Sequence, residues 1–187
     1  ISTVLTALDA AQSGFEPKTM MRYLRSALSP LDPDLCDIVE NYIITWGIRG
    51  RKWLQVWEYH PEGLGVVWEE NHRRYLDRLN GARVSVIEPL SHLREGFLAA
   101  KCVRDQVLAI YGFLREIHLE NRLDLLAQEL DAAGDNRSAQ ILNQLWEILL
   151  TALEQMYDVL GETQWDGEHF TRLFRLLLSQ YEVGTIP

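Results

Sequence analysis

Apolar residues recur every three or four positions along most of this chain, which is the spacing of amphipathic α-helices. The pattern predicts a first helix over residues 1–12, closed by Ser13-Gly14, and a second from Pro17 to Leu28. A third helix starts after Asp32, which suits an N-cap, with Pro33 in the first helical position. Its predicted buried face consists of Leu35, Ile38, Val39, Tyr42, Ile43 and Trp46.

The same periodicity returns near Trp68 and continues to the end of the chain. Asn80-Gly81 predicts an interruption of the helix that starts near Trp68, and Pro89 predicts that the following helix begins, kinks or breaks at this position. Further helices are predicted over 103–117 and 119–130. A long one ending at Gly161 follows, with an apolar face of Leu142, Leu145, Trp146, Leu149, Leu153, Met156, Tyr157 and Leu160. The last helix is capped by Asp166 and buries Phe170, Leu173, Phe174, Leu177 and Tyr181.

The stretch from Val39 to Trp53 has the most distinctive pattern. Gly47 fits the position after a helix end, where glycine enters the left-handed region without strain, and Ile48 can then fold back on that helix. Gly50 frees a loop that carries three cations, and Trp53 anchors it. Residues 53–65 are irregular, with a brief extended piece expected at Leu54–Trp57.

We therefore expect an all-α fold, an irregular bundle of about seven or eight helices. No repeat of roughly 34–45 residues is present, which argues against a helical solenoid. The expected organisation is one domain over residues 1–187, excised from a longer chain because it starts at Ile1 and trails off after Val183. It would comprise N-terminal helices (1–48), a basic and aromatic loop (49–67) and a helical bundle (68–187).

Composition indicates the cellular compartment of this domain and whether it spans a membrane. Hydrophobic residues make up 47% of the chain, yet no apolar run reaches the roughly 18 residues of a membrane span. Cys36 and Cys102 are far apart and lie in apolar helical patterns, which favours buried thiols in a reducing compartment. We expect a cytoplasmic protein with no membrane contact.

The net charge of −9 argues against an autonomous, non-specific nucleic-acid binder. That charge is uneven. Residues 1–48 carry 3 basic and 6 acidic side chains, residues 49–83 carry 7 and 5, and residues 84–187 carry 8 and 16. One modestly basic segment therefore lies between two acidic ones.

No catalytic motif accompanies this basic segment. A phosphate-binding Gly-x-x-x-x-Gly-Lys-Ser/Thr loop, a Gly-x-Gly-x-x-Gly motif and a His-Glu-x-x-His helix are all missing from the sequence. Five scattered histidines and two separate cysteines predict no metal site. We predict no catalytic residue.

The remaining candidates are basic and aromatic. Five side chains could contact phosphates: Arg49, Arg51, Lys52, Arg73 and Arg74. Trp53, Trp57 and Trp68 could stack on unpaired bases. The alternative interpretation is that the tryptophans pin the loop to the core and the arginines are solvated or paired with carboxylates.

Three pieces of the chain resemble the B subunit of the bacterial AddAB (RexAB) helicase–nuclease. They are Phe15 to Leu28, with Tyr23-Leu24-Arg25; Glu40-Asn41-Tyr42 through Gly47-Ile48-Arg49-Gly50-Arg51-Lys52-Trp53; and Glu88-Pro89-Leu90 to Leu114. The second is the most specific, and its matched residues are structural: Glu40, Asn41, Tyr42, Gly47, Gly50 and Trp53. Cys102 departs from the family, where a threonine cap is expected, so the following helix could start differently.

This resemblance implies a location and a role. The chain would be a non-catalytic helical insertion, akin to the 2B subdomain of UvrD-like helicases, in a subunit that helps process DNA double-strand breaks. ATP, Mg²⁺ and a 4Fe–4S cluster would belong to parts of the parent outside this segment. The implied partners are neighbouring domains of the same subunit, an AddA-type subunit and DNA. The alternative is a stand-alone helical adaptor that binds a partner through its acidic C-terminal half, which an exposed apolar patch on the last helix would favour.

Overall fold

A computed structural model describes the backbone of residues 2–183 and the side chains of residues 3–180. These residues form eight α-helices and a short 3-10 helix, and no strand occurs among them. The all-α expectation is confirmed. No described helix has the length and hydrophobicity needed to cross a bilayer.

The chain divides into two compact units. The first consists of residues 6–91, and the second is built from residues 92 onward together with the first residues of helix α1 (Ser2–Gln12). The boundary falls inside a long helix, at residues 91 and 92, and coincides with neither end of the predicted 49–67 loop.

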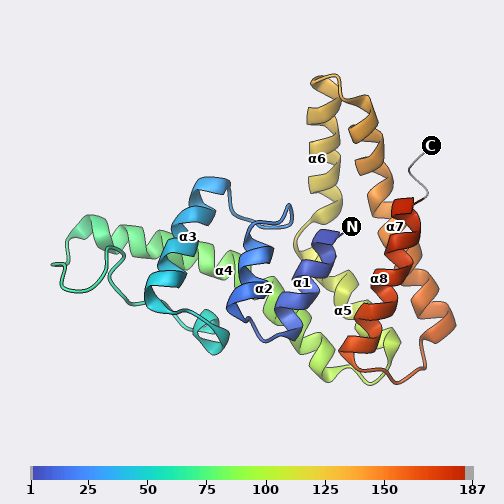
Figure 1. Cartoon of the computed structure of the whole chain (residues 1–187), viewed down its shortest axis with the longest axis horizontal. Coiled ribbons are helices and arrows are strands. Elements are labelled where there is room, and N and C mark those ends of the chain that lie inside the picture. Colours follow the sequence, from blue (N-terminus) through green and yellow to red (C-terminus); the bar gives the residue numbers. More distant parts are fainter. Residues whose placement is uncertain (1, 184–187) are drawn as a thin grey trace. The chain divides into compact units, whose positions relative to one another are not determined.

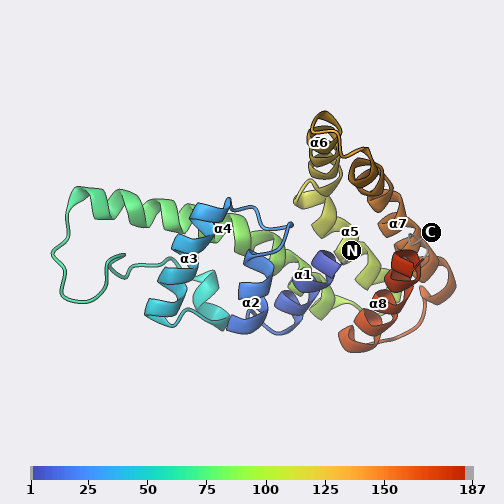
Figure 2. The ribbon, with the colours of Figure 1, turned by 45° about the horizontal axis from the view of Figure 1, so that its top comes forward.

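The 6–91 unit contains most of α1 (Ser2–Gln12), α2 (Pro17–Leu24), α3 (Pro33–Trp46), the 3-10 helix η1 (Gly50–Leu54) and residues 70–91 of α4 (Glu70–Ala99). Both ribbon views show α3 lying beside α4 (Figures 1 and 2). The caps behave as predicted at the start of α3, where the Asp32 carboxylate accepts a hydrogen bond from Leu35 N at 2.8 Å.

Helix α2 ends at Leu24, four residues earlier than predicted. The Ser26 hydroxyl donates to the Tyr23 carbonyl at 2.7 Å, so a side chain takes an acceptor that a continuing helix would use. Leu28 is buried nonetheless, which explains why its position fitted the apolar stripe.

Helix α4 runs unbroken through Asn80-Gly81 and past Pro89, so the predicted interruption is wrong. A proline inside a helix removes one backbone hydrogen bond, and a 30-residue helix can retain the others on either side. Asn80 has a different role, described below.

The second unit contains the end of α4, then α5 (Val103–Glu116), α6 (Leu119–Ala132), α7 (Asn136–Leu160) and α8 (Gly167–Val183). Helix α7 contacts α5, α6 and α8, so the long helix is the common neighbour of this unit. Figure 1 shows α6 and α7 side by side, joined by a tight turn. The predicted Asp166 cap of α8 is present, with His169 N donating to its carboxylate at 2.8 Å. This hydrogen bond lowers the pKa of Asp166.

Helix α5 starts at Val103 with Cys102 as its N-cap residue, although the cysteine side chain makes no capping bond. The first two amides of the helix instead donate to the connection between α7 and α8: Val103 N to Thr163 O at 2.9 Å and Arg104 N to Gly161 O at 3.0 Å. Tertiary carbonyls thus replace the threonine cap, and the helix starts at the expected place.

Candidate nucleic-acid interface

The basic turn begins at a glycine-terminated helix. Gly47 lies in the left-handed region (φ 57°, ψ 47°), and its amide donates to Ile43 O. Ile48 N donates to the same carbonyl at 3.0 Å, and the Ile48 side chain is buried. The predicted helix stop, with its apolar residue folded back, is therefore confirmed.

The Lys52 side chain folds back onto the C-terminal end of α3. Its ammonium lies 3.4 Å from Trp46 O and 3.3 Å from Gly47 O, and the charge of a cation near the last carbonyls of a helix is favourable for the helix dipole. Lys52 therefore contributes to the local fold as well as to the positive charge of the turn.

The turn itself is the 3-10 helix η1, held at its start by Gly50. Gly50 has a positive φ of 53°, and its amide donates to Phe15 O at 3.1 Å in the connection between α1 and α2. A loop that the sequence left irregular is thus a compact turn fixed to a neighbouring element.

Trp53 lies at the end of η1 and is fully buried. Its ring packs edge-on against Trp57 at 5.4 Å, and Trp57 stacks on Tyr42 of α3 at 5.0 Å. Trp46 of α3 stacks on Tyr59 at 4.6 Å in the same way. This aromatic layer attaches the irregular segment after η1 to the face of α3.

Hydrogen bonds fix the polar edges of the same layer. The Tyr42 hydroxyl donates to Tyr59 O at 3.0 Å, and Trp46 Nε1 donates to His60 O at 3.2 Å. Burial raises the pKa of Tyr42 to about 12.

Two residues of α4, neither of which was predicted from the sequence pattern, hold this segment from the other side. Asn80 accepts from Trp57 N and donates to Trp57 O, each at 2.9 Å. Arg83, which is buried, donates to Trp53 O at 3.0 Å and to Asn80 Oδ1 at 3.1 Å. Burial lowers the pKa of Arg83. A polar pair three residues apart on an amphipathic helix was the available signal, but Asn80 was assigned to a helix break.

The burial of Trp53 and Trp57 excludes them as stacking surfaces for bases, because a nucleobase cannot reach either ring face. The alternative interpretation, in which these tryptophans pin the loop, is therefore correct. Trp68 differs, since 39% of it is exposed and its ring packs edge-on against His60 at 4.5 Å.

The five predicted phosphate-contacting side chains are all exposed and all belong to the 6–91 unit. Lys52 and Arg73 border two hollows that share Val56, Trp57 and Glu58, with volumes of about 160 and 550 Å³. Arg49 and Arg51 flank the start of η1, and Arg74 follows Arg73 on α4. Among the described residues, Arg49, Arg51, Arg73 and Arg74 form no salt bridge.

The other residues of the matched motif have structural surroundings. Glu40 is buried and forms a two-pronged ion pair with Arg25, whose Nε donates to Glu40 Oε1 at 2.7 Å. Cys36 lies one turn earlier, and burial raises the pKa of its thiol, with a further contribution from the Glu40 carboxylate. Asn41 is exposed on α3.

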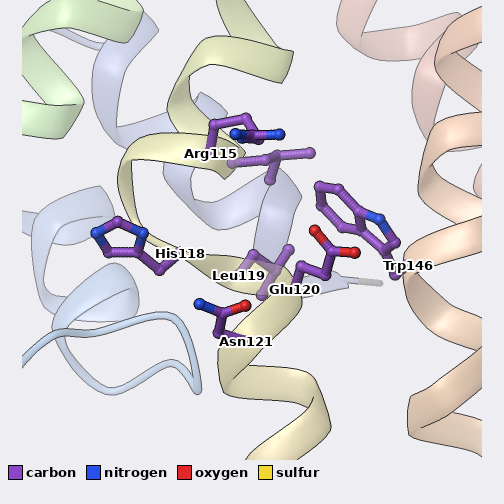
Figure 3. A pocket seen from close by; sticks show the side chains of 7 residues that line it. Arg115, His118, Leu119, Glu120, Asn121 and Trp146 are labelled. Atoms are coloured by element: carbon purple, nitrogen blue, oxygen red, sulfur yellow. The ribbon is translucent and has the colours of Figure 1, made fainter.

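The second unit has a separate small hollow of about 120 Å³ at the start of α6 (Figure 3). Arg115, His118, Leu119, Glu120 and Asn121 line it together with Trp146 from α7. His118 adopts a positive φ of 51° and gives the helix no side-chain cap. Because one guanidinium and one carboxylate share this hollow, its charges do not favour an anionic ligand, and we assign no function to it.

The described residues do not bring together three or more His, Cys, Asp or Glu side chains in a way that could hold a metal ion. Cys36 is buried, with its thiol donating to Leu24 O at 3.3 Å, and Cys102 directly precedes α5 in the other unit. A 4Fe–4S cluster takes four cysteine thiolates, so these two residues do not fit it.

The geometry defines an all-helical segment that carries an exposed basic turn on a rigid aromatic base. No family model matches the chain. It is nevertheless similar over 98% of its length to the B subunit of the ATP-dependent helicase/deoxyribonuclease of three bacteria. The identities are 27% for Caldanaerobacter subterraneus subsp. tengcongensis, 31% for Clostridium kluyveri and 28% for Clostridioides difficile.

The chain spans about 16% of the length of each of these relatives. The resemblance to AddB-type proteins is therefore confirmed: the chain is similar, along its whole length, to one segment of the B subunit of this helicase/deoxyribonuclease.

Proposed function

We propose that this chain is a non-catalytic helical domain of an AddB-type subunit and that its basic turn contacts DNA. The parent would be an ATP-dependent helicase/exonuclease that processes double-strand breaks for recombinational repair, in the cytoplasm and together with an AddA-type subunit. The end-to-end similarity to these helicase/deoxyribonuclease relatives supports the family, and the missing nucleotide-binding and catalytic motifs support a non-catalytic role.

One observation carries the DNA contact. Arg49 and Arg51 are exposed on a turn whose backbone is fixed by the Gly47 helix stop, the Gly50–Phe15 hydrogen bond and the buried Trp53. Neither guanidinium forms an ion pair with a carboxylate among the described residues. Cations presented on a rigid turn can meet phosphates with little loss of conformational entropy.

The test is the salt dependence of DNA binding by the full-length subunit in its complex. Each lost phosphate contact reduces the slope of log K against log salt by about 1, so Arg49→Ala with Arg51→Ala should reduce it by about 2. Arg137→Ala, which removes an exposed arginine of the other unit, is the matched control and should leave the slope unchanged. An unaltered slope in the double variant would refute the contact.

Lys52, Arg73 and Arg74 extend the proposed surface but need separate variants. Lys52→Ala also removes the contacts with Trp46 O and Gly47 O, so its binding data require a stability measurement alongside. Arg73→Ala and Arg74→Ala lack that complication and should each reduce the slope by about 1.

The adaptor alternative is less well supported. It predicts an exposed apolar patch on the last helix. Phe170, Phe174 and Leu178 of α8 are fully buried, and Leu173 and Leu177 are half-buried. Among the described side chains of α8, Leu176 is the exposed large apolar residue (57%). Phe170 packs edge-on against Phe97 of α4 at 5.4 Å. Tyr181, also predicted on this face, lies outside the described side chains. The covered face of α8 counts against docking through this helix.

A further inference from the structure

Large apolar side chains gather on one segment of the 6–91 unit, between η1 and α4. Seven of them are exposed within fifteen consecutive residues: Leu54, Val56, Tyr59, Leu64, Val66, Val67 and Trp68. Exposure is greatest at Leu64 (88%) and Val67 (79%). Single exposed apolar residues are ordinary, but a concentration of this kind usually marks an interaction surface.

The backbone of this segment is irregular. Between Gly63 and Glu69 the described chain forms neither helix nor strand: Leu64 and Gly65 form a turn, with Gly65 at a positive φ of 80°, and residues 66–69 have no regular secondary structure. Two β-branched valines in succession favour an extended backbone. Such a stretch can pair with a strand from a partner while its side chains enter an apolar surface.

The charged residues near the segment indicate which charge a partner surface should carry. Between Leu54 and Glu70 the sequence has four glutamates (Glu58, Glu62, Glu69 and Glu70) and neither lysine nor arginine. Arg73 lines a hollow with Val56 and Trp68, and Lys52 lines one with Val56 and Tyr59, so those apolar residues adjoin the proposed DNA surface. The acidic edge belongs to residues 62–70, which contain Leu64, Val66 and Val67 and carry three of the four glutamates. Because carboxylates repel phosphates, residues 64–67 are not an extension of the basic turn. An apolar surface edged by lysine or arginine is the complementary partner.

Packing and hydrogen bonds of two histidines, His60 and His72, fix the residues on both sides of this segment. His60 packs edge-on between Trp68 and His72, each at 4.5 Å. Its Nδ1 accepts from Glu62 N at 3.1 Å, and the corresponding nitrogen of His72 accepts from Glu69 N at 3.2 Å. Since both ends are held, docking would order only the few residues between them.

We propose that residues 64–68, the docking segment, bind an apolar, basic-edged surface on another part of the same polypeptide, outside these 187 residues. This rests on the proposal that the chain is a segment of a larger subunit, but not on the DNA contact. The relatives are about six times as long as this chain, so most of such a subunit is available as a partner. Covalent linkage makes that contact intramolecular, which favours it over the same contact with a separate protein.

Hydrogen exchange in the full-length subunit, without DNA or its partner subunit, tests this proposal. We expect the amides of residues 64–68 to exchange at least tenfold more slowly than those of an unpaired exposed peptide. Val67→Asp and, separately, Leu64→Asp should abolish that protection by placing a carboxylate in the apolar contact. Val159→Asp on α7 is the matched control, because Val159 is 78% exposed, and it should leave the protection intact.

Fast exchange of residues 64–68 in the full-length subunit alone would overturn the proposal. So would protection that appears only on adding the partner subunit or DNA, or only at high protein concentration, because each outcome identifies a different occupant. The two proposals fail separately: Val67→Asp should leave the salt slope of DNA binding unchanged, whereas Arg49→Ala with Arg51→Ala should leave the exchange of residues 64–68 unchanged.

Discussion

Asn80 pairs with both polar groups of the Trp57 peptide, through one hydrogen bond of 2.9 Å in each direction. Asn80 belongs to a regular helix, whereas Trp57 lies 23 residues earlier in a segment without secondary structure. The side-chain amide thus takes the place of a neighbouring strand. This pairing, strengthened by Arg83, holds the aromatic layer and the basic turn against α4.

Removing this tether should destabilise the 6–91 unit. Asn80→Ala leaves two peptide groups of Trp57 without partners, at a cost of about 1–3 kcal/mol in the free energy of unfolding. Urea denaturation followed by tryptophan fluorescence measures this cost. Asn143→Ala, at an exposed position of α7, is the control and should change stability by less than about 0.5 kcal/mol. Equal urea midpoints for Asn80→Ala and the unaltered chain would contradict the tether.

Substitution by alanine should have opposite effects on stability at two glycines, one at the end of α3 and one inside α4. Gly47→Ala places a side chain at φ 57° and should destabilise the chain by about 1–2 kcal/mol. Gly81 is exposed inside α4, and a Cβ there would meet nothing within 4 Å, so Gly81→Ala should stabilise by about 0.5–1 kcal/mol. Thermal or urea unfolding separates the two, and destabilisation of similar size by both would indicate that the left-handed conformation is not the cause.

In the second unit α4 and α5 approach closely, so a substitution on α4 should destabilise the chain and a second substitution on α5 should restore stability. A Cβ on Gly96 would lie 2.6 Å from the Cβ of Ala109, closer than real carbon contacts allow. Gly96→Ala should therefore cost about 1–3 kcal/mol by overpacking. Adding Ala109→Gly removes the clashing methyl group and should recover much of the loss. An unfolding series in which the double variant is less stable than Gly96→Ala would argue against this packing.

Tyr42 predicts a loss of stability at high pH. Its pKa in the folded chain is raised by burial from about 10 to about 12, so folding favours the neutral phenol. The resulting stabilisation is fully present below pH 10 and disappears as the pH rises towards 12, with a magnitude of about 2–3 kcal/mol. Tyr42→Phe should flatten the dependence of unfolding free energy on pH in this interval. Tyr111→Phe, at an exposed tyrosine, should not, and equal profiles for the two variants would refute the assignment.

Features that depend on a few neighbouring residues were predicted correctly. Asp32 caps α3, Gly47 ends it and Asp166 caps α8, because caps are formed by atoms within three or four residues of each other. The long helix α7 was also predicted from its apolar face, and it ends at Leu160, directly before Gly161. Trp53 was expected to anchor the turn, and its ring is fully buried; its alternative role as a stacking surface for bases was wrong.

Features that depend on distant residues were missed. Asn80-Gly81 has the composition of a turn, but packing of α4 against the 53–60 segment keeps it helical, and Asn80 uses its amide on Trp57 instead. Cys102 lacks a capping side chain, yet α5 starts at the expected position because Gly161 and Thr163 supply carbonyl acceptors.

The sequence by itself determined the helical class, most helix ends and the resemblance to helicase/deoxyribonuclease B subunits, because periodicity and capping are local and the most specific matched motif is continuous. Tertiary structure decided which tryptophans are inaccessible, which cations stay unpaired, and that residues 64–68 expose an apolar, acidic-edged segment. Those properties depend on which side chains meet across tens of residues, and a linear pattern does not contain that information.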